Sequence, residues 1–161
     1  MTPPRVLFLC SGNYYRSRFA EELFNALAEE RALPWRADSR ALVEHLEALV
    51  DNVGPISSHV LSGLRDRGYR PRHHERYPCA VTAAAFPGFA RIVAMDDSEH
   101  RPMIEGRFTE HAGRVEYWNV PDTGALDPER ALAALEDGVR TLIEECAGDH
   151  GLRAPVRAIV E

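Results

Sequence analysis

The sequence has few cysteines, and its three, at positions 10, 79 and 146, lie far apart. This spacing fits neither a disulfide framework nor a zinc site, and it is typical of a protein in a reducing compartment. The chain also lacks an apolar run of about 18 residues, the length that a membrane span requires. Its N-terminus lacks the basic region and long apolar stretch of a signal peptide. We therefore expect a cytoplasmic protein without a membrane segment.

Basic residues are also in the minority. The chain has 19 Lys and Arg against 25 Asp and Glu, which gives a formal charge of −6. This balance argues against nucleic acid or an anionic membrane as the main partner. At 161 residues, 45% of them hydrophobic, the chain can bury one full core. We therefore expect a single domain over residues 1–161, without repeats or low-complexity segments.

Strand and helix patterns alternate along the chain. Apolar runs predict strands at residues 5–9, 35–39, 92–95 and 115–118, and helical spacing predicts helices at residues 17–30, 42–50, 58–68, 98–105 and from 128 onward. Asp127 would cap the last helix and Pro128 would open it. This alternation indicates an α/β fold, with a mainly parallel central sheet of about four strands and helices on both faces. Two alternatives stay open for the segment after about Gly148: an added strand or a loose end.

The most informative segment is residues 6–17, in which an apolar strand runs into a loop that begins with Cys10 and ends with Arg16. The five residues between them are enough to curl backbone N–H groups around a tetrahedral oxyanion. Arg16 would add a planar fork of donors, and the following helix would add the positive end of its dipole. These surroundings favour the thiolate form of Cys10. The loop therefore predicts a phosphate site that contains its own nucleophile.

The rest of the loop supports this interpretation. Gly12 and Asn13 stand where the loop needs unusual backbone angles, and Ser17 can hydrogen-bond the sulfur of Cys10. In the alternative interpretation, Cys10 is a buried thiol at a strand end and Arg16 is a solvated residue of the first helical turn. The candidate phosphate-binding residues are Ser11, Gly12, Asn13, Tyr14, Tyr15, Arg16 and Ser17.

The segment VLFLCSGNYYRSRFAEELF, residues 6–24, resembles the N-terminal signature of the low-molecular-weight protein tyrosine phosphatases and of the related thioredoxin-coupled arsenate reductases. The resemblance covers about residues 5–146 and leaves residues 147–161 as a C-terminal extension. Ser39 falls where the family's second strand ends, Met95-Asp96 resembles the end of its buried strand, and Asp122 falls in the loop of its general acid. The resemblance implies a three-layer fold with the phosphate loop after the first strand, and it implies catalytic roles for Cys10, Arg16 and Asp122.

The chemistry needs a proton donor as well as a nucleophile. When a thiolate displaces an alkoxide or phenoxide from phosphorus, a carboxylic acid can protonate the leaving oxygen. Asp127 precedes Pro128 and a helix, so an N-cap explains it better. Asp122 follows a predicted strand and matches the family position. The alternative for Asp122 is an ordinary turn residue.

Three positions depart from the family pattern. Many relatives carry a second cysteine where this chain has Tyr15, so a protective disulfide with Cys10 is not expected. Tyr14 and Tyr15 either line the pocket mouth, where they could stack on an aryl substrate, or pack on the neighbouring helix. Arg18 replaces a proline and is either an extra cation near the entrance or a solvated residue. The loop after Asp122 lacks the family's aromatic residues.

Other polar clusters are weaker candidates. His73, His74 and Glu75 suggest a metal site only superficially, because adjacent loop residues seldom converge on one ion. Asp96 and Asp97 follow a strand and precede a helix, so they are better explained as helix caps. We therefore expect no metal site.

Two reactions fit these residues. The first is phosphomonoester hydrolysis through a cysteinyl-phosphate, which needs no metal or cofactor and would act on a phosphorylated protein or a small aryl phosphate. The second is arsenate reduction, in which Cys79 would resolve the adduct on Cys10. A third possibility is a phosphate-binding module that has lost catalysis. We expect a monomer or a weak dimer.

Overall fold

The computed structural model describes residues 2–122 and 124–160, with side chains up to residue 148. Its strands are β1 (Arg5–Cys10), β2 (Arg36–Ala41), β3 (Arg91–Ala94) and β4 (Val115–Tyr117). Its α-helices are α1 (Arg16–Glu30), α2 (Ser58–Asp66), α3 (Asp97–Arg107) and α4 (Pro128–Val160). Short 3₁₀ helices span Leu46–Ala48, Ala83–Gly88 and Thr109–Arg114. No helix in the described part of the chain is both long and apolar enough to cross a membrane.

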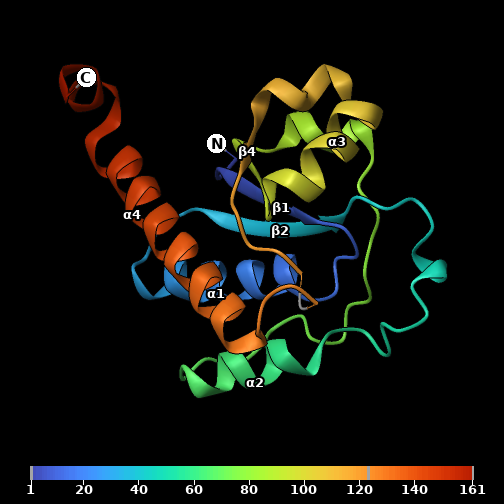
Figure 1. Ribbon diagram of the computed structural model, residues 1–161. Helices are drawn as coiled ribbons and strands as arrows, with labels where there is room; N and C mark the ends of the chain where they lie inside the picture. Colours follow the sequence, from blue (N-terminus) through green and yellow to red (C-terminus); the bar gives the residue numbers. More distant parts are fainter. Residues whose placement is uncertain (1, 123, 161) are drawn as a thin grey trace.

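The four strands form one parallel sheet in the order β2-β1-β3-β4. Helices α1, α2 and α4 lie on one side of the sheet, and α3 lies on the other (Figure 1). Residues of β1 alternate between the two cores: Val6 and Phe8 pack toward α1 and α4, and Leu7 and Leu9 pack toward α3. This alternation is the period of a strand covered on both faces. The predicted three-layer α/β fold is confirmed.

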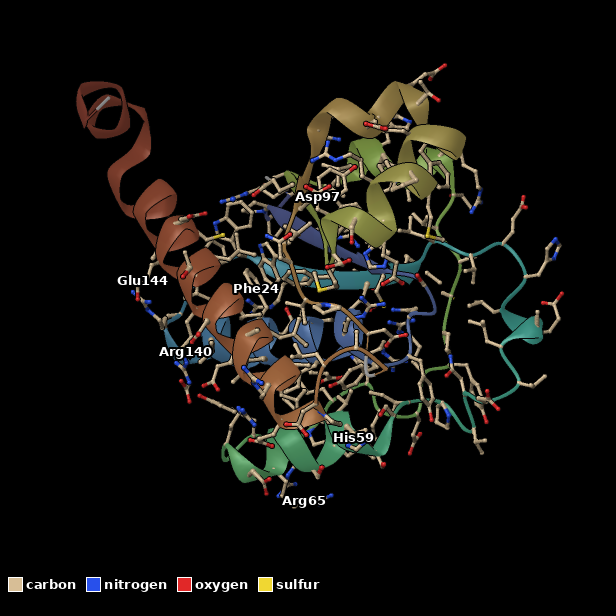
Figure 2. All side chains as sticks on the ribbon, viewed as in Figure 1. Phe24, His59, Arg65, Asp97, Arg140 and Glu144 are labelled. Atoms are coloured by element: carbon tan, nitrogen blue, oxygen red, sulfur yellow. The ribbon has the colours of Figure 1, made fainter. Side chains whose placement is uncertain are left out.

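The long helices meet the sheet through their apolar faces. Phe24 of α1 is buried, whereas Arg140 and Glu144 project from the outer side of α4 (Figure 2). Close approach of α4 to the end of the sheet requires Gly138, because a Cβ there would come within 2.9 Å of the Trp118 ring. At its start, α4 is capped by Asp127, whose Oδ2 accepts from the N–H of Arg130 at 3.3 Å. The predicted cap is confirmed.

The helix predicted at residues 42–50 is wrong. The segment contains only one short 3₁₀ helix, and its ends lie in different surroundings, with Leu42 fully buried and Val50 exposed. The reason is that its first amides bond to the chain beside β2. The N–H of Leu42 donates to the carbonyl of Cys10 at 2.9 Å, and the N–H of Val43 donates to the carbonyl of Ser11 at 3.1 Å. The segment therefore continues along the loop after β1 instead of coiling.

Beyond residue 147, the backbone stays helical to Val160 as part of α4, so the added strand, one of the two expected alternatives, is not found. An added strand would also need an open edge of the sheet, and the β2 edge is occupied. Ala37 donates to Oδ1 of Asn25 at 2.8 Å and accepts from its Nδ2 at 3.1 Å. Ala41 pairs in the same way with the carbonyl of Cys79 and the N–H of Val81. These contacts block further strand pairing along β2.

Replacing Asn25 by Ala should test this closure of the edge. The variant leaves both backbone groups of Ala37 without their partner, so the free energy of unfolding should fall by about 2 kcal/mol. Urea denaturation would measure the change. Glu30→Ala, at an exposed position of the same helix, should change stability by less than about 0.5 kcal/mol. Equal stability of the two variants would show that water replaces the hydrogen bonds of Asn25 to the backbone of Ala37 at no cost.

Candidate active site

The loop of residues 11–15 connects β1 to α1 and lies at the floor of a cleft of about 570 Å³. Cys10, the last residue of β1, is 3% exposed, and Arg16 is the first residue of α1. Residues 48–52 form another wall of the cleft, and Asp122 reaches it from the segment after β4. The structure therefore brings Cys10, Arg16 and Asp122 to one cleft, at the carboxyl ends of the strands, where α/β sheets bind ligands.

Asn13 fixes the shape of the loop. Its φ angle of 52° lies in the left-handed region, which is uncommon for a residue with a side chain. Its Nδ2 donates to the hydroxyls of Ser17 and Ser39, at 2.9 and 2.8 Å. Its Oδ1 accepts from the N–H of Cys79 at 3.0 Å and from Arg76 at 3.2 Å. These four bonds offset the backbone strain.

Ser17 links this network to Cys10. Its Oγ lies 3.0 Å from Sγ of Cys10 and accepts a hydrogen bond from Asn13. Because Ser17 accepts from Asn13, its own hydroxyl hydrogen is available to a thiolate at Cys10. The predicted contact between Ser17 and the sulfur is present.

Gly12 does not have the unusual backbone angle that we expected, because its φ is not among the positive values. Its small size serves close packing instead. A Cβ at this position would lie 3.0 Å from Cδ1 of Leu49 and 3.1 Å from Nδ2 of Asn52. Glycine therefore lets the loop approach the wall at residues 48–52.

Arg76, which was not among the predicted site residues, belongs to the network beneath the loop after β1. It donates to Glu21 at 3.1 Å and to the hydroxyl of Ser39 at 2.9 Å, in addition to its contact with Asn13. Ser39 in turn donates to Glu21 at 2.6 Å. The buried carboxylate of Glu21 thus holds Arg76 and Ser39 in place around Asn13. No spacing in the sequence relates Arg76 to the loop, so only the fold reveals it.

Arg16 is almost completely buried and held from two sides. Its Nη1 and Nη2 each lie 3.0 Å from an oxygen of Glu99, and Nη1 also donates to the carbonyl of Val120 at 2.9 Å. Its Nε lies 3.9 Å from Oδ1 of Asp122. Burial lowers the pKa of Arg16, but the hydrogen bonds to Glu99, together with the nearby charges of Cys10, Glu99 and Asp122, raise it overall. Arg16 is therefore always charged.

Glu99 was not among the predicted site residues. It accepts a hydrogen bond from the hydroxyl of Ser11 and lies 3.3 Å from Nε2 of His100. Contact with His100, followed by hydrogen bonds from Arg16 and Ser11, holds the pKa of Glu99 well below its usual range. A sequence signal did exist, because Asp96 and Glu99 have the spacing of a capping box.

The structure fulfils only half of that capping box. Asp96 caps α3 by accepting from the N–H of Glu99 at 3.1 Å, as predicted for a helix cap. The N–H of Asp96, which the Glu side chain of a capping box would bond, instead donates to Nδ1 of His100 at 3.0 Å. Glu99 is thereby free to turn toward Arg16.

The two candidate acids occupy different places. Asp122 lines the cleft, and its side chain is 62% exposed. Asp127 caps α4 instead, and its carbonyl also accepts from the N–H of Ala131 at 2.9 Å. The geometry therefore places Asp122, and not Asp127, beside Arg16.

Tyr14 and Tyr15 line the cleft and also pack on its walls. The hydroxyl of Tyr14 donates to the carbonyl of Val53 at 2.6 Å. Tyr15 is 6% exposed, its hydroxyl lies 3.3 Å from the carbonyl of Pro128, and burial raises its pKa to about 12. The two predicted alternatives, lining the mouth and packing on neighbours, are thus both realised.

Neither expectation for Arg18 is correct, because its side chain is fully buried. It donates to the carbonyls of Asn13, Pro55 and His73, at 3.4, 3.0 and 2.9 Å. Burial lowers its pKa. Arg18 lies on the first turn of α1, next to the three loops that contain these carbonyls. Its guanidinium donates a hydrogen bond to each loop. Arg18 therefore supports the phosphate loop from behind.

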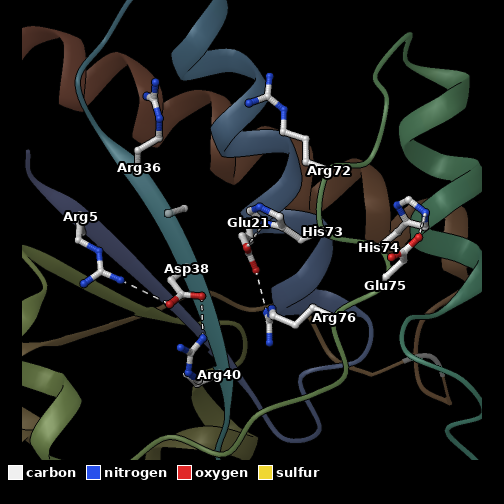
Figure 3. Close-up of a pocket in the computed structure, with 11 residues that line it drawn as sticks. Arg5, Glu21, Arg36, Asp38, Arg40, Arg72, His73, His74, Glu75 and Arg76 are labelled. Atoms are coloured by element: carbon white, nitrogen blue, oxygen red, sulfur yellow. Dashed lines mark hydrogen bonds and ion pairs between the residues drawn. The ribbon is translucent and has the colours of Figure 1, made fainter.

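A larger groove, of about 720 Å³, lies along the outer side of β2 (Figure 3). Two of its carboxylates each hold two basic side chains. Asp38 pairs with Arg5 and Arg40, and Glu21 pairs with Arg76 and His73. In the part of the chain that the structure describes, no group of three His, Cys, Asp or Glu could hold a metal ion. We therefore place the candidate active site at Cys10.

The model of the family described as "Low molecular weight phosphotyrosine protein phosphatase" matches residues 5–150. The chain belongs to this family. It is a cysteine-dependent phosphatase of the protein tyrosine phosphatase type. No curated protein matches the chain in sequence.

Solved structures share the fold of this phosphatase at low identity. YfkJ from Bacillus subtilis is 20% identical, with a TM-score of 0.74 over 94% of this chain and 97% of that one. A low molecular weight phosphotyrosine phosphatase from Vibrio cholerae O395 is 22% identical, with a TM-score of 0.72 over 88% and 95%. Wzb from Vibrio vulnificus, in complex with benzylphosphonate, is 15% identical, with a TM-score of 0.72 over 88% and 98%.

Replacing Arg18 by Met, which has a long side chain without donors, should test its supporting role. Three carbonyl oxygens would lose their donor, so we expect the free energy of unfolding to fall by about 3 kcal/mol or more in urea denaturation. Arg65→Met, at an exposed position of α2, is the matched control and should stay within about 0.5 kcal/mol of the wild type. A loss below 1 kcal/mol for the Arg18 variant would contradict this role.

Proposed function

We propose that the phosphatase hydrolyses phosphomonoesters through a cysteinyl-phosphate, with Cys10 as nucleophile, Arg16 as phosphate ligand and Asp122 as general acid. The observation that carries this proposal is the set of donors left on Arg16. A guanidinium has five N–H groups. Both N–H groups of Nη1 are used, one by Glu99 and one by the carbonyl of Val120. One N–H group of Nη2 is used by Glu99. The remaining fork, Nε–H with the second Nη2–H, lies on the edge nearer Asp122 and matches two phosphate oxygens.

In the first step, the Cys10 thiolate attacks phosphorus and forms the S–P bond, while the bond from phosphorus to the leaving oxygen breaks. Asp122, in its acid form, transfers its proton to that oxygen, so the product leaves as a neutral alcohol or phenol. Arg16 and the N–H groups of residues 11–16 hold the three phosphoryl oxygens as charge shifts among them. Ser17 stabilises the sulfur in its thiolate form.

In the second step, a water molecule attacks the phosphorus of the cysteinyl-phosphate. The Asp122 carboxylate, left by the first step, takes a proton from that water. The S–P bond breaks, and inorganic phosphate and the Cys10 thiolate are released. Asp122 is again protonated, so the cycle closes without a metal ion or cofactor.

Several features support a phosphorylated protein or a small aryl phosphate as the substrate. The rings of Tyr14 and Tyr15 and the aliphatic side chains of Leu49 and Val50 line the cleft above the nucleophile. The net charge of −6 disfavours nucleic acid as a partner. A cytoplasmic location and a monomer or weak dimer complete the proposal.

Arsenate reduction is supported less well. It would require Cys79 to attack the adduct on Cys10 from within reach of the cleft. The backbone of Cys79 is instead bonded beneath the loop, with its N–H on Asn13 and its carbonyl on Ala41. Of the described residues that line the cleft, Cys10 is the only cysteine.

Two assays run side by side would test the reaction class. Hydrolysis of p-nitrophenyl phosphate in the presence of a metal chelator should proceed at the full rate. Arsenate reduction coupled to thiols should stay at the background level. Turnover of arsenate with no release of phosphate from the aryl ester would overturn the proposal.

The nucleophile can be identified by alkylation. Because Cys10 is the proposed nucleophile, iodoacetate should inactivate the enzyme with one equivalent incorporated, and inorganic phosphate or vanadate should protect it. Peptide mapping by mass spectrometry would locate the modified residue. Equal labelling of Cys79 or Cys146 with full retention of activity would refute the assignment.

The general acid can be identified from its dependence on the leaving group. Asp122→Asn should lower kcat by roughly 10² to 10⁴ for alkyl and phenyl phosphates, and much less for a leaving group that departs unprotonated. The basic limb of the pH profile should flatten while the acidic limb remains. Asp127→Asn is the control, because Asn caps a helix about as well as Asp. A loss that depends on the leaving group in Asp127→Asn, with Asp122→Asn near the wild type, would instead assign the general acid to Asp127.

A further inference from the structure

Glu99 grips Arg16 by one edge of its guanidinium. Its two carboxylate oxygens lie 3.0 Å from Nη1 and Nη2, which is the end-on bidentate geometry. The carboxylate leaves the neighbouring edge, with Nε, directed toward Asp122 and the cleft. The bidentate contact with Glu99 therefore determines which edge of the Arg16 guanidinium is available to a phosphate.

Neighbouring groups hold Glu99 itself in place. The hydroxyl of Ser11, in the phosphate loop, donates to Oε2, and so does Nη2 of Arg16. His100 is fully buried, and its Nδ1 accepts from the N–H of Asp96 at 3.0 Å. A ring nitrogen that accepts carries no hydrogen, so the hydrogen of the neutral ring is on Nε2, 3.3 Å from Oε2 of Glu99. Helix α3 therefore places the Nε2 edge of the ring beside the carboxylate, although the two do not form a hydrogen bond.

We propose that Glu99 is a positioning residue of the phosphatase, which orients Arg16 for the transition state before substrate binds. This inference rests on the proposed function of Arg16. Arg16 spans the distance from α1 to the cleft with several rotatable bonds, and an unrestrained side chain would lose that freedom at each turnover. If Glu99 already holds the N–H donors of Arg16 in the required orientation, this loss of side-chain entropy does not add to the barrier when charge develops on the phosphoryl group.

The burial of the pair separates this role from that of an ordinary surface ion pair. The side chain of Arg16 is 3% exposed and that of Glu99 is 31% exposed. Surface pairs such as Asp97 with Arg101, on the same helix, are 42% and 46% exposed and touch no residue of the cleft. Glu99 instead bridges the catalytic arginine and Ser11 of the phosphate loop.

Substitution of Glu99 should therefore lower turnover in a graded way. Glu99→Gln keeps one acceptor but turns an NH₂ group toward the Arg16 donors, and kcat for p-nitrophenyl phosphate should fall about 10-fold. Glu99→Ala removes both acceptors, and kcat should fall about 10²-fold, the order expected for a misplaced catalytic group. Glu105→Gln, at an exposed position of α3, is the control and should stay within about twofold of the wild type. Rates should be normalised to the folded fraction measured by circular dichroism, so that unfolded protein does not lower the apparent kcat.

A double-mutant cycle with Arg16→Lys shows whether Glu99 acts through Arg16. If it does, adding Glu99→Gln to the Arg16→Lys enzyme should lower kcat by less than about twofold, because the guanidinium that Glu99 orients is already gone. Multiplying losses would assign Glu99 a separate structural role and overturn the inference. So would a Glu99→Ala enzyme as active as the control. Full activity of Arg16→Lys alone would instead contradict the proposed function of Arg16.

Discussion

The left-handed backbone of Asn13 is the constraint on which the site depends. A residue with a side chain adopts this conformation at a cost, and here four hydrogen bonds of the side chain hold it. The same bonds connect the loop to β2 through Ser39 and to the segment after α2 through Arg76 and Cys79. The loop therefore has one shape because two distant parts of the chain, β2 and the segment after α2, bond to the side-chain amide of Asn13. Ser17 transmits that order to the sulfur of Cys10.

Arginine provides most of the remaining connections around the loop. All 19 basic residues of the chain are arginines. Arg16, Arg18 and Arg76 each bond to several acceptors at once, which a lysine ammonium on a flexible stem does with less directional control. Arg18 bonds only to backbone carbonyls, and Arg16 bonds mainly to the half-buried carboxylate of Glu99. Arg76 divides its bonds among a buried carboxylate, an amide oxygen, a hydroxyl and backbone carbonyls. Positive charge is thus distributed beneath the loop as well as within it.

Local patterns in the sequence predicted the parts of the molecule that local forces determine. The strand before Cys10, the cap at Asp127 and the separation of Asp122 from Asp127 follow from short-range periodicity and turn chemistry. Residues 42–50 were misread because their leucine spacing suits a helix while their amides bond to the loop after β1. Arg18, Arg76 and Glu99 could not be placed, because each has a partner that is distant in sequence, 37, 55 and 83 residues away respectively. Long-range hydrogen bonds of this kind leave no periodic signal.

The wall at residues 48–52 differs in kind from the floor of the cleft. The floor is fixed by bonds that reach into the core, whereas Val50 and, just beyond the wall, Val53 are 79% and 76% exposed and belong to neither hydrophobic cluster. The wall is nevertheless joined to the floor, because the segment that leads to it runs alongside the loop after β1. Evolution can therefore vary the side chains of this wall without disturbing the bonds that hold the loop after β1. The shape of the loop and the surface of the wall are separable traits in this fold.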